Sequence, residues 1–550
     1  MMTRLGFDVW KPISVGLWLL LLAFLVWPLS SVLLASFIDN DSGAWSLSNY
    51  VDLWQSRAFH RAFINTFIAG FGGMAGALVL GLTLAVLTSY WSVKGRGLIQ
   101  TLAILALVSP PFIGAYAWIV LFGANGSVRV FLRDWGLAIP TIYGAGGVIL
   151  VFAFKFYPYV YLIVSGALQA LNPSLEEAAE SLGVPPWQRF FKITLPMIMP
   201  AIVGSALLTF VLSIADFGTP RLIGRDFNVL ATEAFSLFAS EIGGHAGGAS
   251  ALSVILIVTS SVFVLLQRYA VRSDLYHSGL VKSRTPHSAK GLGAIMVYGL
   301  AYLIVLCGAI PAITAVLFSF RKTSGPVFQQ GWSLQSYEKI LSSLSTPIIN
   351  TLNYSLSAVC LIVMVGTLLG YLIARRRGPS TAALDTLLMV PYLVPGIVMG
   401  IALVTRFNVP PLAITGTGFI IILAVFVRRL PYASRAVAMA LRQLSPSLEE
   451  AAISLGYKPW RAFTRVTVPL IAPGIMAGAL MSFVTAMNEL SASLVLYVGG
   501  TITMPVRIYL SVMDGDYGTA SALATVLLAL TVISVATAFH LSGRKQSVLL

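Results

Sequence analysis

The stretch PSLEEAAESLGVPPWQRFFKITLPMIMP, residues 173–200, recurs without gaps as PSLEEAAISLGYKPWRAFTRVTVPLIAP, residues 446–473. The two copies share 17 identical residues in 28 positions. A weaker match keeps the same order along the chain, because WSLSNY from Trp45 corresponds to WSLQSY from Trp332. Self-similarity of this kind indicates a chain built from two related halves.

The composition places these halves in a membrane. Of 550 residues, 57% are hydrophobic and 10% are charged, with a mean hydropathy of +0.87. Soluble proteins carry about 25% charged residues, so this class is excluded. Only two cysteines are present, Cys307 and Cys360, which excludes a disulfide scaffold and a CxxC metal site. The net charge of +15 is typical of cytoplasmic loops rich in Lys and Arg, and we expect the lipid bilayer, not nucleic acid, as the surrounding partner.

Long apolar runs predict the membrane spans, because a bilayer core about 30 Å thick needs roughly 20 apolar residues per helix. Twelve such runs are expected, at residues 13–37, 62–90, 98–123, 142–168, 197–217, 249–271, 292–320, 348–374, 382–406, 413–440, 470–490 and 519–541. The predicted fold class is therefore an all-α polytopic membrane protein with 12 transmembrane helices.

Six spans in each half give both halves the same orientation. This is a parallel repeat, related by an axis along the membrane normal, with a pathway expected between the halves. We assign residues 1–272 to a first six-span domain, 273–291 to a cytoplasmic linker and 292–550 to a second six-span domain.

The basic residues set the expected orientation. With a cytoplasmic N-terminus, the inner loops and helix ends hold 24 of the 35 Lys and Arg residues, a count that includes Lys155, Arg428 and Arg429. Because basic residues in short loops resist translocation, both termini are predicted to be cytoplasmic.

Each copy of the repeated stretch predicts a short helix, a turn and a second helix. Ser174 can cap the first helix while Glu177 reaches back to form a capping box. Gly183 then ends the helix in a left-handed conformation, and Pro186 starts the next one. The second copy repeats this pattern at Ser447, Glu450, Gly456 and Pro459.

The same residues resemble the EAA loop of permease subunits of binding-protein-dependent ABC importers, whose pattern is E-A-A, three residues, Gly, nine residues, I-x-L-P. The first loop, about 170–196, fits throughout with Glu177, Ala178, Ala179, Gly183, Ile193, Leu195 and Pro196. The second loop, about 443–469, fits with Val466 and Val468 in place of Ile and Leu. The resemblance implies the type I ABC importer permease fold, in which each loop forms a coupling helix that docks on an ATPase subunit. It assigns that docking role to Glu176, Glu177, Ala178, Ala179 and Gly183, and to Glu449, Glu450, Ala451, Ala452 and Gly456.

This resemblance also implies the partners: two copies of an ABC ATPase and a periplasmic substrate-binding protein, at the bacterial inner membrane. Two halves fused in one chain look most like ferric-iron importer permeases, with thiamine or another small solute as the alternative cargo. The chain has no G-x-x-x-x-G-K-[ST] loop. We therefore expect a permease that is not an enzyme and binds no metal or cofactor, with ATP and Mg on the partner subunits. A 12-helix secondary transporter is the rival from another class, although such carriers should show charged residues within their helices.

Two acidic residues complete the candidate sites. Asp216 and Glu489 occupy equivalent positions, expected near the outer end of the fifth span of each half. Two interpretations stay open: hydrated helix ends, or a pair of carboxylates that faces the pathway or gate. By contrast, G-x-x-x-G spacings indicate close helix packing. They occur at Gly72–Gly76, Gly366–Gly370, Gly396–Gly400 and Gly474–Gly478.

Overall fold

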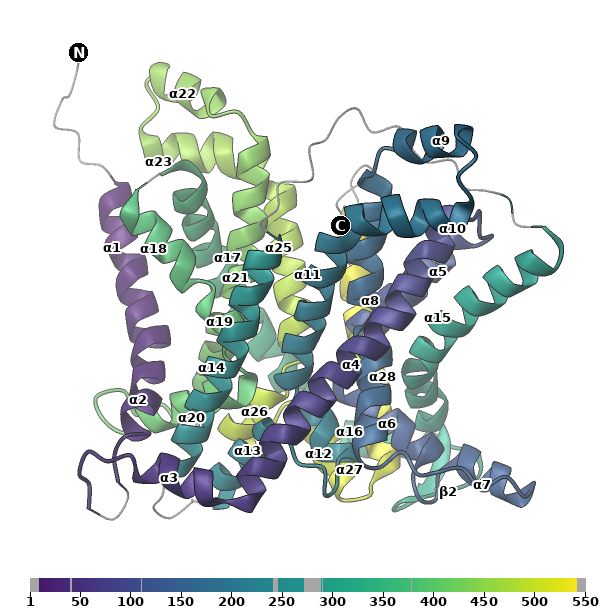
Figure 1. Ribbon diagram of the computed structural model, residues 1–550. Helices are drawn as coiled ribbons and strands as arrows, with labels where there is room; N and C mark the ends of the chain where they lie inside the picture. Colours follow the sequence, from purple (N-terminus) through teal and green to yellow (C-terminus); the bar gives the residue numbers. More distant parts are fainter. Residues whose placement is uncertain are drawn as a thin grey trace.

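The computed structural model describes residues 9–39, 42–109, 111–240, 246–271, 288, 290–376 and 378–541 (Figure 1). The predicted linker 273–291 therefore lies almost entirely outside the described residues. The elements of the first half are α1 (Trp10–Leu21), a π-helical turn (Leu22–Val26), α2 (Trp27–Ala35), α3 (Ser48–Gln55), α4 (Arg57–Tyr90), α5 (Arg96–Val108), α6 (Pro111–Phe122), α7 (Ser127–Asp134), α8 (Ala145–Ala170), α9 (Ser174–Ser181), α10 (Pro186–Arg189), a π-helical turn (Phe190–Thr194), α11 (Leu195–Ile214), α12 (Gly218–Ile223), α13 (Leu230–Ser240) and α14 (Ala246–Val271).

The second half repeats this order. Its elements are α15 (Gly291–Ser319), β1 (Arg321–Ser324), β2 (Val327–Trp332), α16 (Gln335–Ser343), α17 (Ser345–Arg375), α18 (Pro379–Leu387), α19 (Val390–Leu393), α20 (Gly396–Phe407), α21 (Gly418–Gln443), α22 (Ser447–Ser454), α23 (Pro459–Ala462), a π-helical turn (Phe463–Thr467), α24 (Val468–Leu470), α25 (Ala472–Met487), α26 (Ser491–Leu496), a 3-10 turn (Gly499–Thr501), α27 (Met504–Met513) and α28 (Tyr517–Leu541). The antiparallel hairpin β1–β2 is a small exception to the all-α prediction.

The expected count of twelve spans is not confirmed. Nine helices in the described ranges are long and apolar enough to cross a membrane, and two further helix pairs are bent by 107° and 72°. α21 has 26 residues, but Arg428, Arg429 and Arg435 lie within it and set it apart from the nine. The expected span 98–123 is divided between α5 and α6.

Proline explains the sharper bend, which lies between α19 and α20 inside the expected span 382–406. Val394 precedes Pro395, and a residue before proline is pushed out of the helical region. Val394 accordingly has an extended backbone, with φ −95° and ψ 113°, and the helix restarts at Gly396 in a new direction.

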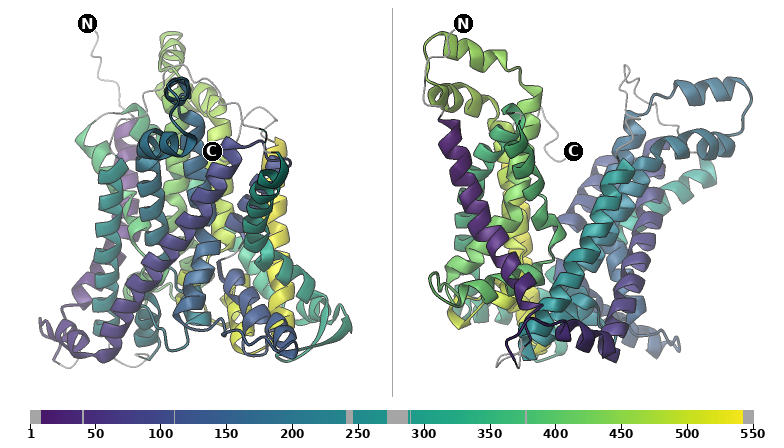
Figure 2. Two further views of the ribbon diagram at one scale, coloured as in Figure 1. Left: turned by 45° about the vertical axis from the view of Figure 1, so that its right-hand side comes forward. Right: turned by 60° about the vertical axis from the view of Figure 1, so that its left-hand side comes forward.

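The first helices of the two halves are exchanged. α1 and α2 pack against α17 and α20 of the second half, whereas α15 packs against α5 and α6 of the first. In Figure 2 the two halves diverge toward the end that carries α9 and α22, and they meet at the opposite end. The exchanged helices therefore tie together two halves that would otherwise touch mainly at one end.

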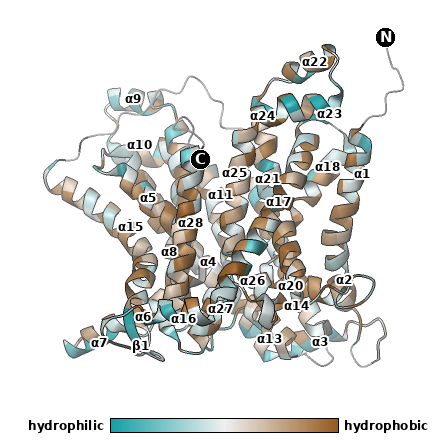
Figure 3. Ribbon diagram, turned by 180° about the vertical axis from the view of Figure 1, so that it is seen from behind, coloured by the Kyte–Doolittle hydropathy of each residue, from teal (hydrophilic) through white to brown (hydrophobic). Residues whose placement is uncertain are grey.

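Within each half, small residues allow the longest helices to lie close together, as the G-x-x-x-G spacings predict. α4 packs along α8, where a Cβ added to Gly76 would lie 2.6 Å from the Cβ of Ala153. α17 packs along α21 in the same way, with an added Cβ at Gly366 2.9 Å from that of Ala433. Figure 3 shows hydrophobic residues along these helices and hydrophilic residues gathered at α9, α10 and α23 at one end and at β1 and α7 at the other.

Candidate functional site

The two loops fold alike, but the predicted capping boxes are wrong. α9 begins at Ser174 with Glu176 and Glu177 in its first turn, and no side chain caps it. The Asn172 carboxamide oxygen instead accepts a hydrogen bond from the Ser174 backbone N–H, at 3.1 Å. α22 likewise has no side-chain cap. The two glutamates still suit the first turn, where the helix dipole favours negative charge.

The predicted left-handed stop is confirmed in both loops. Gly183 has φ +76° and Gly456 has φ +95°, which residues with a Cβ rarely adopt. The Val184 N–H donates to the Ala179 carbonyl oxygen at 3.0 Å, and Gly183 donates to Glu180 at 2.9 Å, which is the Schellman arrangement. Pro186 and Pro459 then open α10 and α23, as predicted.

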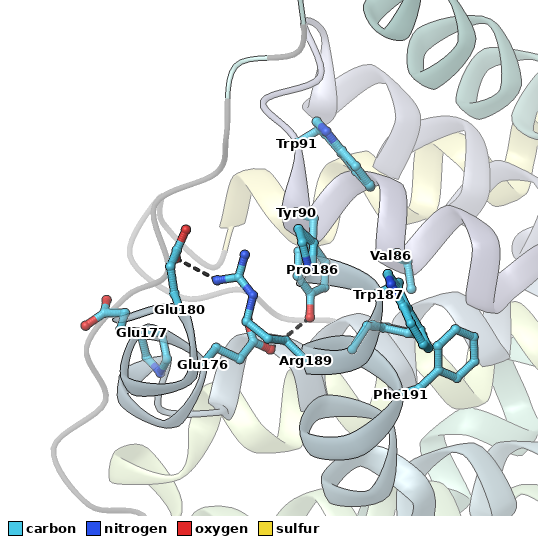
Figure 4. A pocket seen from close by; sticks show the side chains of 12 residues that line it. Val86, Tyr90, Trp91, Glu176, Glu177, Glu180, Pro186, Trp187, Arg189 and Phe191 are labelled. Carbon is cyan, nitrogen blue, oxygen red and sulfur yellow. Dashed lines mark hydrogen bonds and ion pairs between the residues drawn. The ribbon is translucent and has the colours of Figure 1, made fainter. Parts of the chain in front are cut away.

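The first glutamate of each loop is tied to its own half. Glu176 accepts hydrogen bonds from the Tyr90 hydroxyl at 2.9 Å and from the Thr194 hydroxyl (Figure 4). Tyr90 is the last residue of α4, and Thr194 ends the π-helical turn before α11. This contact therefore joins the loop helix to the ends of two long helices.

The second half repeats this arrangement. Glu449 accepts from the Tyr371 hydroxyl at 2.5 Å and from the Thr467 hydroxyl at 3.1 Å. Thr194 and Thr467 occupy the same position in the two aligned copies, so the repeat itself could have identified the threonine of each contact. The tyrosines come from distant helices, and only the structure identifies them.

The opposite face of each loop helix is open. Glu177 and Ala178 are exposed, whereas Ala179 is buried at 8% exposure. Leu182, which is not among the predicted docking residues, has 83% of its surface exposed beside Gly183. The second loop presents the same surface, with Glu450 and Ala451 exposed, Ala452 buried and Leu455 also 83% exposed.

Both acids of the predicted pair form ion pairs within the helical bundle. Lys155 of α8 pairs with Asp216, which follows α11. Arg428 and Arg429 of α21 both pair with Glu489, which follows α25; the Arg429 contact is 2.6 Å. The prediction that these three basic residues lie in inner loops or at helix ends is wrong. They lie inside 26-residue helices, where charge is kept only when it is paired.

Each acid also begins the short helix that follows it. Asp216 Oδ1 accepts from the Thr219 N–H at 2.8 Å at the start of α12. Glu489 Oε1 accepts from the Ala492 N–H at 3.1 Å at the start of α26. The Asp216 and Glu489 side chains are only 11% and 3% exposed, so the structure contradicts the interpretation of hydrated helix ends.

Within the described ranges, no three His, Cys, Asp or Glu residues gather closely enough to hold a metal ion. The charged side chains of Lys155, Asp216, Arg428, Arg429 and Glu489 are used in ion pairs, and the two acids also in helix starts. The site thus consists of two matching loop helices at one end and two matching ion pairs inside.

Comparison with known proteins places the chain among transport components. Residues 77–273 and 366–545 match the family described as binding-protein-dependent transport system inner membrane component. One region falls in each half, which supports the internal repeat.

Three curated relatives match along most of their length. A putative ferric transport system permease protein, FbpB 1 of Haemophilus influenzae, is 29% identical and covers 89% of this chain and 78% of its own. The ferric transport system permease protein FbpB of Actinobacillus pleuropneumoniae is 30% identical and covers 93% of this chain and 75% of its own. The Fe(3+)-transport system permease protein FbpB 2 of H. influenzae is 28% identical, covering 84% and 86%. Since the two matched regions make up more than half of the sequence, the chain belongs to the inner membrane components of binding-protein-dependent transport systems, as the multi-pass permease of a bacterial ABC importer.

Proposed function

We propose that this permease imports ferric iron delivered by a periplasmic binding protein, driven by two separate ATPase subunits that bind ATP and Mg. The observation that carries the proposal is the loop geometry, which both halves share. In each loop the first glutamate is hydrogen-bonded to a tyrosine of its own half, the following Glu-Ala pair is exposed, and an exposed leucine precedes a glycine in the left-handed conformation. Ferric iron is supported by the names of the relatives. Thiamine or another small solute is the alternative cargo.

Each loop helix acts as a coupling helix. The docking surface consists of Glu177, Ala178 and Leu182 in the first loop and their counterparts in the second. Alanine permits close approach, and the glutamates offer carboxylates to basic groups of the partner. Glu176 and Glu449 have a different role. Their hydrogen bonds to tyrosine and threonine transmit a movement of the loop helix, caused by the ATPase, to the long helices.

The loops face the cytoplasm in this proposal, and so do both termini. α1 begins near the end that carries α22, since Trp10 contacts Trp460 and Phe463. α28 leads from the opposite end toward the same side (Figure 1). The proposed domain bounds remain 1–272 and 292–550, joined by a cytoplasmic linker.

The acidic pair contributes to the gate. Both ion pairs sit where a long helix breaks into a short one, so loss of either would loosen α12 or α26. If both acids act on one gate, Asp216→Asn together with Glu489→Gln reduces iron uptake more than the two single changes added, because effects of coupled residues are not additive. ATPase activity that persists while uptake is lost would distinguish a gate from a coupling defect.

The cargo is tested by uptake in cells that lack their own ferric importer and express this chain with its ATPase and binding protein. We expect accumulation of radioactive Fe³⁺ that excess thiamine does not reduce. Accumulation of thiamine without iron would overturn the proposed cargo and leave the coupling proposal standing.

A further inference from the structure

A cavity of about 820 Å³ lies between α9, α10 and the end of α4 (Figure 4). Three aromatic residues line its wall: Tyr90, Trp187 and Phe190. Trp460 and Phe463 occupy the aligned positions of Trp187 and Phe190, and Tyr371 has the role of Tyr90 because each tyrosine donates to the first glutamate of its loop. Tyr371, Trp460 and Phe463 enclose the indole of Trp10 from α1. Trp10 stacks on Tyr371 with ring centroids 4.1 Å apart and is only 2% exposed. The second half therefore fills the aromatic box formed by Tyr371, Trp460 and Phe463 with the first helix of the other half, whereas the first half leaves a cavity among the residues that the structure describes.

The two boxes also differ in charge. Arg189 lines the open cavity and forms a 2.7 Å ion pair with Glu180. The aligned positions of the second loop hold Ile453 and Ala462. The filled box is thus apolar at these two positions, whereas the open cavity carries Glu180 and Arg189 there, beside the carboxylates of Glu176 and Glu177. Such a wall favours an occupant with a cationic group near the carboxylates and an anionic group near the guanidinium.

The walls place the cavity at the membrane boundary. Val86 and Tyr90 belong to the last turns of α4, and Trp187 and Phe191 to the first turns of the segment Pro186–Ile214; both segments can cross a membrane. Tryptophan and tyrosine concentrate at this depth, where lipid headgroups lie. Trp187 is 63% exposed, against 42% for Trp460 in the filled box.

We propose that this cavity binds a membrane phospholipid whose headgroup carries a primary ammonium, such as phosphatidylethanolamine. The Arg189 guanidinium suits the phosphate. The Glu180 carboxylate and the aromatic faces suit the ammonium. Val86 and Phe191 offer an apolar wall to the acyl chains. A segment of the ATPase is the competing occupant, because Glu177 of the proposed docking surface also lines the cavity. Figure 4 shows Glu177 directed away from Trp187 and Phe191, so the aromatic wall of the cavity is left to the lipid.

The membrane location follows from the family, so this lipid site does not depend on the ferric cargo. Only its consequence rests on the proposed function: bound lipid would support the first coupling helix as Trp10 supports the second.

The test is native mass spectrometry of the purified full chain, delipidated and titrated with phosphatidylethanolamine, phosphatidylcholine or phosphatidylglycerol. We expect the ethanolamine lipid to be retained about tenfold better than the glycerol lipid, the factor that one charge-assisted hydrogen bond provides. Glu180→Ile with Arg189→Ala installs the residues that the second half already uses, so folding should be kept while the preference disappears. Trp10→Ala is the matched control, because it opens the box that has Ile453 and Ala462 in place of Glu180 and Arg189 and should add no second ethanolamine lipid.

Equal retention of the three lipids, or a preference that survives in the Glu180→Ile, Arg189→Ala variant, would overturn the proposal. So would protection of Trp187 from oxidative labelling only when the ATPase is bound, because the occupant would then be protein. Iron uptake does not enter these readouts, so their failure is distinguishable from failure of the proposed function.

Discussion

Arg428 of α21 forms an ion pair with Glu489 at the end of α25, and the first half repeats this pair at the equivalent positions, Lys155 and Asp216. The duplication preserves charge, burial and the helix start that follows each acid. The second half adds Arg429, so one carboxylate there faces two guanidinium groups. The two sites therefore share a design but differ in net charge.

This difference predicts unequal effects of neutralising the acids. Removing one partner of a buried ion pair costs about 3–5 kcal/mol, because the other charge is left uncompensated. Glu489→Gln leaves two arginines side by side, whereas Asp216→Asn leaves one lysine. We expect Glu489→Gln to lower the Tm of the detergent-purified chain more than Asp216→Asn does.

The matched control removes both charges of the first pair. Lys155→Met combined with Asp216→Asn should recover part of the Tm lost in Asp216→Asn alone. A double variant no more stable than the single one would show that the Lys155 charge does not matter for folding.

The loop turns give a second prediction. An added Cβ at Gly183 or Gly456 meets no atom within 4 Å, so the penalty of substitution comes from the left-handed backbone alone. Gly183→Val should cost about 1 kcal/mol or more and weaken ATPase binding, with membrane insertion unchanged. Asparagine tolerates this conformation, so Gly183→Asn is the control and should keep most binding in a pull-down with the ATPase. Equal binding by the valine and glycine forms would remove the turn from the coupling account.

The exposed leucines give a third prediction. Leu182 and Leu455 expose most of their surface, and burying such a side chain on a partner is worth about 1.5–3 kcal/mol. Leu182→Asp with Leu455→Asp should reduce the affinity for the ATPase at least tenfold without changing the Tm of the free chain. Leu341→Asp serves as the control, because this leucine is 76% exposed on α16, away from the loops. If the control variant loses as much ATPase affinity as the loop variant, the effect is unspecific.

Stability toward acid gives a fourth prediction. Burial alone would raise the pKa of Asp516, but the Lys339 ammonium at 2.6 Å and hydrogen bonds from Thr519 outweigh it and hold this pKa below its ordinary value. A carboxyl with a lowered folded-state pKa stabilises the protein above its unfolded pKa of about 3.9, and the contribution fades as pH falls through the folded value. The Tm difference between wild type and Asp516→Asn should therefore shrink as pH is lowered from about 5 to 3. The exposed Asp514→Asn is the control, and a gap independent of pH would contradict the assignment.

The sequence predicted the features that depend on local residues. The left-handed glycines, the helix restarts at Pro186 and Pro459, and the helix packing at the G-x-x-x-G spacings follow from backbone conformation and side-chain size. The capping boxes failed because the N-cap positions are Pro173 and Pro446, one residue before the two serines. The Glu177 and Glu450 N–H groups therefore donate to the carbonyl oxygens of these prolines. Membership of the importer family excludes the secondary transporter. Charged residues within helices, which were expected of such a transporter, are nevertheless present at Lys155, Arg428 and Arg429.

The long-range features needed the fold. The basic-residue count predicts Lys155 and Arg428 in loops or at helix ends, because charge usually marks solvent. The spacing of 273 residues that relates the two loops (446 minus 173) nevertheless pairs Lys155 with Arg428, as it pairs Asp216 with Glu489. The Trp10 contact depends on α1 crossing to the other half, and nothing local to Trp10 specifies that. The length of an apolar run predicts a span but does not reveal a bend within it, such as the bend at Pro395. For this reason the sequence predicts twelve spans.

The most direct test of the central claim is iron transport by the chain reconstituted in liposomes with its ATPase inside and its binding protein outside. We predict that Fe³⁺ uptake requires internal ATP and both partner proteins, and that the Leu182→Asp, Leu455→Asp variant abolishes it while remaining folded. Uptake that proceeds without the ATPase, or that the loop variant leaves at the wild-type rate, would contradict an importer driven through these two loops.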